Sequence, residues 1–214
     1  MTGPRVTLFD YGAGNLHSLS KAVERAGAAV RVETDPVAAV ADTDALVLPG
    51  VGAFAAAAER LAPGRDAMRA ALAAGLPSLG ICLGMQLLFG ASDEGPGEGL
   101  GLLAGRVTRI RARRVPQIGW NALEPADAAA PGALGPDTLV TAAGLETAYY
   151  ANSFVCRPDD ETACVTAWST HEGDRFPAVV RAGHTVGVQF HPEKSSAPGV
   201  AFVAAWVGTL GGGR

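Results

Sequence analysis

Residues 78–86 read Ser-Leu-Gly-Ile-Cys-Leu-Gly-Met-Gln, an apolar stretch with a cysteine at its centre. The first four residues have the length and apolarity of a buried strand, and Cys82 comes where this strand is expected to turn into a helix. Gly80 and Gly84 leave room for the tight bend that such a turn requires. A side chain at the bend projects into the crevice beyond the carboxyl end of the strand, where open α/β sheets bind ligands. The stretch predicts an α/β fold with Cys82 as candidate nucleophile, although an inert buried cysteine fits this motif equally well when it is taken alone.

Strands and helices alternate on the N-terminal side of Cys82. Apolar residues at helical spacing predict one helix from Leu16 towards Gly27 and a second over residues 53–74, interrupted at Pro63 and Gly64. Short apolar runs predict strands at residues 6–10, 29–32, 45–48 and 78–81, and residues 11–15 are expected to form the turn after the first strand. This alternation predicts a mainly parallel central sheet flanked by helices on both faces.

The pattern changes after Gly105, where short strand-like runs are separated by turn residues. A helix is expected only near the end, over residues 200–210, and residues 126–136 are rich in Ala, Pro and Gly and predict a surface loop. The runs predict an antiparallel C-terminal extension of the sheet within a single domain of residues 1–214. The strand-like runs are residues 107–110, 139–141, 149–154, 163–168, 178–181 and 185–190.

Length, composition and charge limit the class of protein. A chain of 214 residues with 48% hydrophobic and 18% charged residues can bury a full core. A net charge of −4 argues against a protein that binds nucleic-acid phosphates. The three cysteines have irregular spacing, which predicts neither a zinc site nor a disulfide framework. The sequence shows no secretion signal and no apolar stretch of bilayer length, so a cytoplasmic protein is expected.

A basic run interrupts this acidic chain between Arg106 and Arg114, with further arginines at positions 109, 111 and 113. A solvated strand face and a surface that meets an anionic ligand or partner account for the run equally well.

A second motif, Val188-Gln-Phe-His-Pro-Glu193, supplies the base that a cysteine nucleophile needs. His191 and Glu193 lie two residues apart on extended backbone, so they can pair on one face while Pro192 stiffens the connection. A carboxylate in that place fixes the tautomer of the imidazole. Together with the cysteine bend, the motif predicts a Cys82, His191 and Glu193 triad.

The remaining histidines and cysteines compete poorly for this role. His17 lies early in a predicted helix and is expected to be a surface or capping side chain, and His171 and His184 lie in turn-like segments and are expected to be solvated. Cys156 and Cys164 lie in strand patterns and are expected in the core or beside it.

A third segment, Pro49-Gly-Val-Gly-Ala-Phe54, follows the third predicted strand. Its glycines let backbone amides face a ligand or change orientation, which suits an oxyanion hole. A close-packed strand-to-helix turn accounts for the segment equally well. A phosphate-binding loop is disfavoured because no Gly-Lys-Ser/Thr ending follows.

These segments, in this order, resemble the class I (triad type) glutamine amidotransferases and, among them, the glutaminase subunits of imidazole glycerol phosphate synthase. The resemblance covers nearly the whole chain. Its motifs are Asp-Tyr-Gly-Ala-Gly-Asn-Leu (10–16), Pro-Gly-Val-Gly-Ala-Phe (49–54), Leu-Gly-Ile-Cys-Leu-Gly-Met-Gln-Leu-Leu-Phe (79–89), Gly-Trp-Asn (119–121) and Gly-Val-Gln-Phe-His-Pro-Glu-Lys-Ser (187–195).

The resemblance implies a role for each matching residue. Cys82 would attack the γ-amide carbon of glutamine, His191 would shuttle the proton and Glu193 would hold the imidazole. The amide of Leu83 and a flipped peptide of the loop at Gly52 would form the oxyanion hole. This chemistry needs neither a cofactor nor a metal.

The resemblance also implies a glutamine pocket. Gln86 and Glu94 match positions that line the pocket in the family, and the Glu94 carboxylate could pair with the substrate ammonium. The backbone at Ser153 and Phe154 would receive the substrate carboxylate.

The implied partner is the cyclase subunit, a (β/α)₈ barrel, in a heterodimer. Ammonia would pass through that barrel to a phosphorylated imidazole precursor. Trp120, Asn121 and Tyr149 match family positions near the subunit contact, although plain core packing accounts for Trp120 equally well. Because the loop at Gly50–Gly52 can point its amide either way, we expect the isolated chain to hydrolyse glutamine poorly.

Two departures from the family pattern affect this surface. The family usually has Pro-His before Gly-Trp-Asn, where this chain has Pro116-Gln117. The strand that commonly ends in Val-His-Ser/Thr-Tyr ends here in Ala151-Asn152-Ser-Phe. Both departures concern the interface and its signal to the oxyanion loop, not the triad.

Three other functions remain compatible with the motifs. The chain could serve another acceptor, as in the pyridoxal-phosphate, anthranilate or aminodeoxychorismate systems. It could be a regulatory subunit without activity, although the intact set of Cys82, His191 and Glu193 argues against this. It could also be an unrelated cysteine hydrolase of γ-glutamyl conjugates, which would be active without a partner.

Overall fold

The computed structural model describes residues 3–12, 16–129 and 131–211, so most of the predicted turn at 11–15 lies outside the described residues. The helices are α1 (Leu16–Arg25), α2 (Pro36–Ala39), α3 (Phe54–Leu61), α4 (Arg65–Ala73), α5 (Leu83–Gln86), α6 (Thr138–Ala143) and α7 (Ser196–Thr209), with short 3₁₀ turns at Ala62–Gly64 and Pro192–Lys194. The strands are β1 (Arg5–Phe9), β2 (Ala29–Glu33), β3 (Ala45–Leu48), β4 (Ser78–Ile81), β5 (Gly105–Arg109), β6 (Gln117–Ala122), β7 (Glu124–Pro125), β8 (Thr147–Asn152), β9 (Phe154–Pro158), β10 (Val165–His171), β11 (Asp174–Ala182) and β12 (Thr185–Val188).

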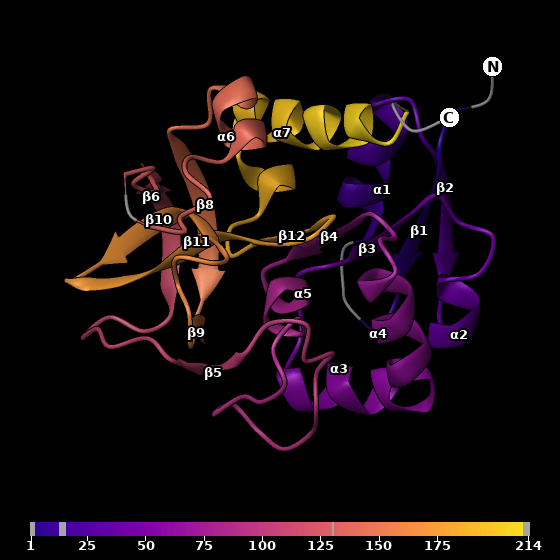
Figure 1. Ribbon diagram of the computed structural model, residues 1–214, viewed down its shortest axis with the longest axis horizontal. Helices are drawn as coiled ribbons and strands as arrows, with labels where there is room; N and C mark the ends of the chain where they lie inside the picture. Colours follow the sequence, from indigo (N-terminus) through magenta and orange to yellow (C-terminus); the bar gives the residue numbers. More distant parts are fainter. Residues whose placement is uncertain (1–2, 13–15, 130, 212–214) are drawn as a thin grey trace.

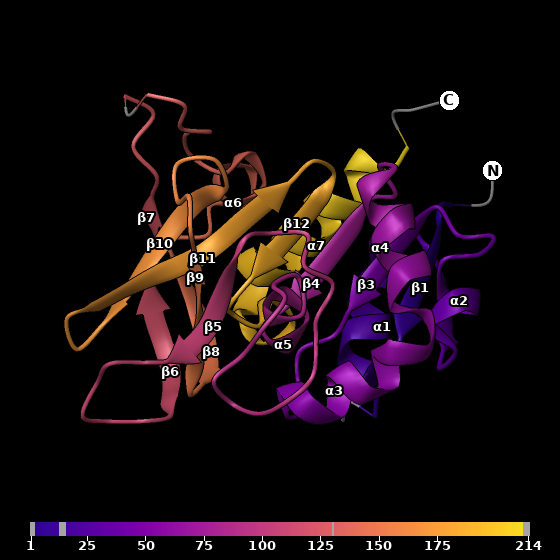
Figure 2. The same ribbon diagram turned by 60° about the horizontal axis from the view of Figure 1, so that its bottom comes forward.

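An eight-stranded sheet forms the centre of the molecule, in the order β2-β1-β3-β4-β12-β11-β10-β7 (Figure 1; β7 is labelled in Figure 2). The strands from β2 to β12 run parallel, and β11, β10 and β7 continue the sheet antiparallel. The predicted α/β class, with its mainly parallel sheet and antiparallel C-terminal extension, is therefore confirmed. The carboxyl ends of β3, β4 and β12 lie side by side, which brings the three predicted motifs to one edge.

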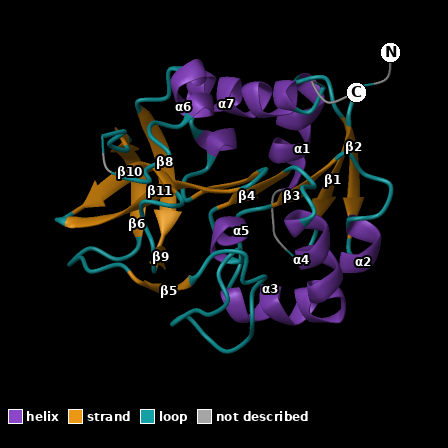
Figure 3. Ribbon diagram, in the orientation of Figure 1, coloured by secondary structure: helices purple, strands orange, loops and turns teal. Residues whose placement is uncertain are grey.

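Helices cover the sheet on both faces, as Figure 3 shows by secondary structure. Helices α1, α6 and α7 lie along one side, and α3 and α4 along the other; the turned view of Figure 2 brings α3 and α4 forward of the sheet and α7 behind it. The two faces of β3 show why. Ala45 and Val47 point into the core that contains α1 and α7, whereas Leu46 and Leu48 point into the core that contains α3 and α4.

The apolar spacing of each long helix matches the core that it covers. In α3 the buried residues are Phe54, Ala57, Ala58 and Leu61, one stripe at helical spacing. The predicted break at Pro63 and Gly64 is confirmed as the 3₁₀ turn between α3 and α4.

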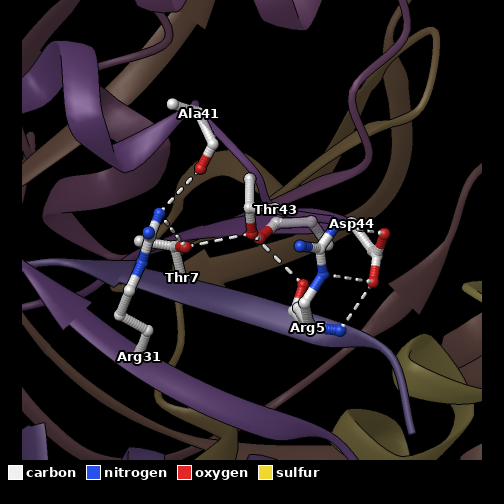
Figure 4. A network of polar contacts seen from close by, with 7 residues as sticks. Arg5, Thr7, Arg31, Ala41, Thr43 and Asp44 are labelled. Carbon is white, nitrogen blue, oxygen red and sulfur yellow. Dashed lines mark hydrogen bonds and ion pairs between the residues drawn. The ribbon is translucent and has the colours of Figure 1, made fainter. Parts of the chain in front are cut away.

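A polar network fastens the strands at the β2 edge of the sheet (Figure 4). The Arg5 side chain and backbone N–H bind Asp44, and the Thr43 hydroxyl donates to the Arg5 carbonyl oxygen. The buried Thr7 hydroxyl donates to Thr43 and accepts from Arg31. Arg31 also donates to the carbonyl oxygens of Ala38, within α2, and Ala41, after it. The network therefore ties β2, β1 and the turn before β3 together.

One prediction from the C-terminal half is wrong. Residues 139–141 have a strand-like sequence but lie in helix α6. The Asp137 side chain accepts the N–H groups of Leu139 and Val140, and Gly144 ends the helix at a positive φ of 58°. This N-cap and C-cap override the weak strand preference of a short β-branched run.

In the antiparallel part, the sequence indicated β5 and β8 but not β6, β7 and β9. Strands β5 and β9 pair as a separate two-stranded sheet, as do β6 and β8, so the extension is not one continuous sheet. Among the described residues, no helix has the length and apolarity needed to cross a membrane.

Candidate active site

Cys82 occupies a strained bend between β4 and α5. Its backbone has φ 49° and ψ −100°, a positive-φ conformation that few residues with side chains adopt. The Cys82 N–H donates to the Val188 carbonyl oxygen at 2.7 Å. A Cβ at Gly84 would lie 2.0 Å from the Leu48 carbonyl oxygen, so only glycine permits this approach to β3. The packing around the bend holds the thiol in one place.

The helix after the bend is shorter than a typical helix. Helix α5 has four residues, and its Gln86 N–H bonds back to the Cys82 carbonyl oxygen at 3.1 Å. Leu83 is its first residue, where helical N–H groups lack intrahelical acceptors. The Leu83 amide is thus placed beside the sulfur, as an oxyanion donor would need to be.

His191 follows β12 and is fixed through its backbone and its ring. Its N–H donates to the Tyr149 carbonyl oxygen at 2.8 Å, and its carbonyl oxygen accepts the Ser195 hydroxyl at 2.7 Å. The ring Nδ1 lies 2.9 Å from Glu193 Oε1. With Nδ1–H donated to the carboxylate, the other ring nitrogen is free to exchange a proton with Cys82.

The surroundings of His191 favour its charged form. Burial lowers the pKa of His191, but hydrogen bonds and charges from Cys82 and Glu193 raise it more, to about 9. The side chains of His191 and Glu193 are only 2% and 9% exposed, so little water screens this pair. An imidazolium in this position is the partner that a Cys82 thiolate needs.

The residues proposed from the sequence line one cavity of about 240 Å³. Glu193 lies behind the cavity wall and reaches it through His191. The predicted residues on the wall are Gly52, Cys82, Leu83, Gln86, Glu94, Ser153, Phe154 and His191, and they are joined by Gly50, Val51, Ala151, Asn152 and Lys194.

Hydrogen bonds position the two predicted glutamine-pocket side chains. Gln86 Nε2 donates to the Phe154 carbonyl oxygen at 3.0 Å, which links α5 to β9. Glu94 Oε2 accepts the Phe54 N–H at 2.9 Å, which caps α3 immediately after the glycine loop. Both contacts hold parts of the cavity wall together.

The other histidines and cysteines lie elsewhere. His17 and His184 are exposed as predicted, whereas His171 is half-buried and its ring lies 3.0 Å from the Arg114 carbonyl oxygen. Cys156 and Cys164 are free and buried, as expected. Burial raises the pKa of both thiols, that of Cys164 to about 11, which disfavours the reactive thiolate.

A larger cavity, of about 660 Å³, lies between Cys164 and the start of α6. Its Arg181 guanidinium is already paired with Asp137 at 2.8 Å. The smaller cavity is therefore the better candidate, because it combines a thiol, a base and glycine-rich backbone.

The arginine run is mostly surface. The side chains of Arg106 and Arg114 form ion pairs with Asp93 and Glu172, and Glu172 also accepts the N–H groups of Arg113 and Arg114. The contacts of Glu172 join the segment after β5 to the turn between β10 and β11, and the Arg106–Asp93 pair joins β5 to the loop after α5. Together they account for part of the run without a ligand.

Comparison with known families settles the class of protein. The sequence pattern of the family "Glutamine amidotransferase class-I" matches residues 7–206. The chain belongs to this family. One curated relative of this amidotransferase is "Imidazole glycerol phosphate synthase subunit HisH" of Symbiobacterium thermophilum, 44% identical over 94% of this chain and 92% of the relative. The protein of the same name from Halobacterium salinarum is 41% identical over 96% of this chain and 93% of its own length.

Solved structures agree on the amidotransferase fold. One, described as a glutamine amidotransferase, has a TM-score of 0.68 and 22% identity, covering 95% of this chain and 98% of its own. A glutamine amidotransferase from Thermotoga maritima has a TM-score of 0.62 and 16% identity, covering 99% of this chain and 85% of its own.

One residue of the amidotransferase site was not singled out from the sequence. Gln189 is fully buried, and its Nε2 lies 3.4 Å from Cys82 Sγ. The signal that could have found it is its position two residues before His191, at the end of the strand-like run that the sequence predicts over residues 185–190.

Proposed function

We propose that this chain is the glutaminase subunit of an imidazole glycerol phosphate synthase and that Cys82, His191 and Glu193 carry the reaction. The observation behind the proposal is that two separate motifs meet, since Cys82 and His191 line one cavity and Glu193 binds the His191 ring from behind its wall. The chain is also 41% and 44% identical to two curated HisH subunits over nearly its full length. Such subunits belong to histidine biosynthesis, and we place the reaction in the cytoplasm.

In the proposed mechanism, His191 takes the thiol proton and Cys82 Sγ attacks the γ-amide carbon of glutamine. The carbonyl electron pair moves onto oxygen, where the amides of Leu83 and of the loop at Gly52 stabilise it. Collapse of this intermediate breaks the C–N bond, and His191 returns the proton to the departing ammonia. The product of this half is a glutamyl thioester on Cys82.

The second half returns the enzyme to its starting state. His191 removes a proton from water, the resulting oxygen attacks the thioester carbon, and the C–S bond breaks with its electron pair on sulfur. Glutamate leaves, and Cys82 regains a proton from His191. Glu193 remains ionised and keeps the imidazole oriented through both halves.

Substrate binding is assigned to the rest of the cavity wall. Glu94 supplies a carboxylate that can pair with the α-ammonium of glutamine, and the backbone at Ser153 and Phe154 supplies donors for its carboxylate. Gln86 holds Phe154 in place by the hydrogen bond at 3.0 Å.

Strands β6 and β8 present an exposed apolar face beside the cavity, and this face supports the proposal that a protein partner binds there. Trp120 and Ile118 are 54% and 68% exposed, so core packing does not account for Trp120. They pair across the strands with Tyr149 and Ala151. Ala151 lines the cavity, and the Tyr149 carbonyl oxygen holds the His191 N–H. We assign this face to the (β/α)₈ barrel cyclase, in a heterodimer that passes ammonia to a phosphorylated imidazole precursor.

The test uses the chain together with a barrel cyclase and its imidazole precursor. The wild-type chain should hydrolyse glutamine much faster with the cyclase than alone, and the mixture should make imidazole glycerol phosphate. Cys82→Ala should abolish synthesis from glutamine and retain synthesis from added ammonia, because only the nucleophile is lost. Cys164→Ala, at the unrelated cavity, should retain both.

Glutamine-dependent synthesis by Cys82→Ala would refute the nucleophile. If the chain alone hydrolyses glutamine rapidly and the cyclase does not change the rate, the proposed partner is refuted. The proposal that the chain hydrolyses glutamine would still hold.

A further inference from the structure

A single short segment contacts Cys82 at three points. The Val188 carbonyl oxygen accepts the Cys82 N–H at 2.7 Å, the Gln189 amide nitrogen lies 3.4 Å from the sulfur, and His191 is the acid–base partner. Gln189 and His191 are two residues apart in the bend where the chain leaves β12, and the side chains of both reach the sulfur from this segment.

The Gln189 side chain is enclosed on all sides. It is 0% exposed, its backbone N–H donates to the Ala178 carbonyl oxygen at 2.9 Å, and its Oε1 has no hydrogen-bond partner among the described residues. An unpaired buried carbonyl destabilises a fold, so a purely structural role would be better served by an apolar side chain of the same size. The buried amide therefore lowers the stability of the fold, and its N–H has the sulfur as partner.

The orientation of the amide decides what it can do. A thiolate is stabilised by N–H donors and destabilised by a carbonyl oxygen at the same distance. With Nε2 towards Cys82, the amide adds a neutral hydrogen bond to the thiolate that His191 already stabilises by charge. Unlike the imidazolium, this donor does not give up its proton during the reaction.

We infer that Gln189 is a further catalytic residue, whose side-chain N–H stabilises the Cys82 thiolate alongside His191. The inference rests on the proposed role of Cys82 as nucleophile and adds a second donor to the triad. It follows that the reactivity of Cys82 at neutral pH depends on position 189 even when His191 and Glu193 are intact.

The test measures alkylation of Cys82 by iodoacetamide as a function of pH, read by mass spectrometry of the peptide that contains residue 82. Gln189→Leu removes the N–H and the unpaired carbonyl together and keeps a similar volume, so the fold should be retained. We expect the pH of half-maximal alkylation to rise by about one unit, because a hydrogen bond to the thiolate is lost. The rate at neutral pH should fall several-fold.

A matched control is Thr108→Val. Thr108 Oγ1 is also buried and also has no hydrogen-bond partner among the described residues, but it lies on β5 outside the cavity wall, and its substitution should leave the profile of Cys82 unchanged. Gln189→Met, which also lacks the N–H, replaces the leucine variant if that variant does not fold.

A folded Gln189→Leu or Gln189→Met chain with the wild-type alkylation profile would overturn the inference. Alkylation requires neither glutamine nor a cyclase. A chain that proved inactive on glutamine would therefore refute the proposed function without changing this result.

Discussion

Glu193 holds the His191 ring at 2.9 Å and, with Cys82, outweighs the effect of burial on the pKa of the imidazole, which is raised to about 9. A raised pKa means that the proton is bound below about pH 9 and is lost as the pH rises through that value. The imidazolium that stabilises the thiolate therefore disappears on the alkaline side. The pH at which activity falls on the alkaline side therefore depends on the strength of the contact between His191 and Glu193.

Glu193→Gln should move that limb. The amide can still accept the Nδ1–H, but the negative charge is gone, so the pKa of His191 should fall and the alkaline limb of kcat/KM should shift to lower pH. The rate of glutamine hydrolysis in the presence of the cyclase should fall by about 10²-fold. Glu59→Gln, on the exposed side of α3, is the control and should match wild type. If the alkaline limb of Glu193→Gln matches that of wild type, the Glu193 carboxylate has no part in the mechanism.

At the residue scale, the triad was the most predictable part of the site. A cysteine between Gly80 and Gly84 and a His-Pro-Glu motif have few other uses in combination, so chemistry alone paired them across more than a hundred residues. The contact between Gln189 and the sulfur was not predictable in the same way. It depends on the exact end of β12, and a glutamine in a strand can serve many purposes besides contact with a thiol.

At the scale of elements, the Asp137 side chain stabilises residues 139–141 as part of helix α6, although their sequence is strand-like. It is 3% exposed, caps α6, and binds both Arg181 and Thr166. Burial raises the pKa of Asp137, but the hydrogen bonds and charge of Arg181 lower it more, so the carboxyl is held below its ordinary value. Its contribution to stability is present above the unfolded pKa of about 3.9 and is lost as the pH falls below it.

Asp137→Ala should lower the free energy of unfolding by about 3 kcal/mol at neutral pH, since a cap is lost and Arg181 is left unpaired. Asp35→Ala is the matched control. Asp35 caps α2 through the same two backbone contacts and pairs with no arginine among the described residues, so its loss should cost about 1 kcal/mol. Urea unfolding measures both. If both variants lose the same free energy of unfolding, the Asp137–Arg181 pair adds no stability beyond the cap. The same conclusion follows if the loss for Asp137→Ala is as large in acid as at neutral pH.

Most elements before Cys82 were predictable, and fewer of those after it were. Buried parallel strands such as β3 and β4 are continuous apolar runs with glycine or proline at their ends, which is a strong local signal. Strands β6 and β7 consist largely of exposed and half-buried residues, and they form only because β8 and β10 offer edges to pair with. Such pairing depends on residues far apart in the chain.

The two departures from the family pattern meet in one of these strand pairs. Gln117 of β6 and Asn152 of β8 are direct cross-strand partners, and both are buried. Asn152 also donates to the Phe154 carbonyl oxygen at 3.1 Å, the same atom that accepts from Gln86. The two departures are therefore a single pair of contacting residues on the strands that carry the proposed cyclase face. Neither residue contacts His191 or Glu193 in the hydrogen bonds described above.

At the scale of the molecule, the eight-stranded sheet joins the N-terminal and C-terminal halves, because β12 inserts beside β4. This pairing brings Val188 to the Cys82 backbone and carries His191 to the thiol. We propose that residues 1–214 act as one domain for this reason: neither half alone contains both the nucleophile and its base. The position of His191 relative to Cys82 is therefore fixed by the pairing of β12 with β4.

The most direct measurement of this arrangement is labelling by a glutamine analogue with an electrophilic carbon in place of the γ-amide. The complex of the chain and a cyclase is incubated with the analogue, with and without excess glutamine, and the adduct is located by peptide mass spectrometry. The account predicts one adduct, on Cys82, that glutamine prevents. An adduct on Cys156 or Cys164 instead, or labelling of Cys82 that glutamine does not affect, would contradict it.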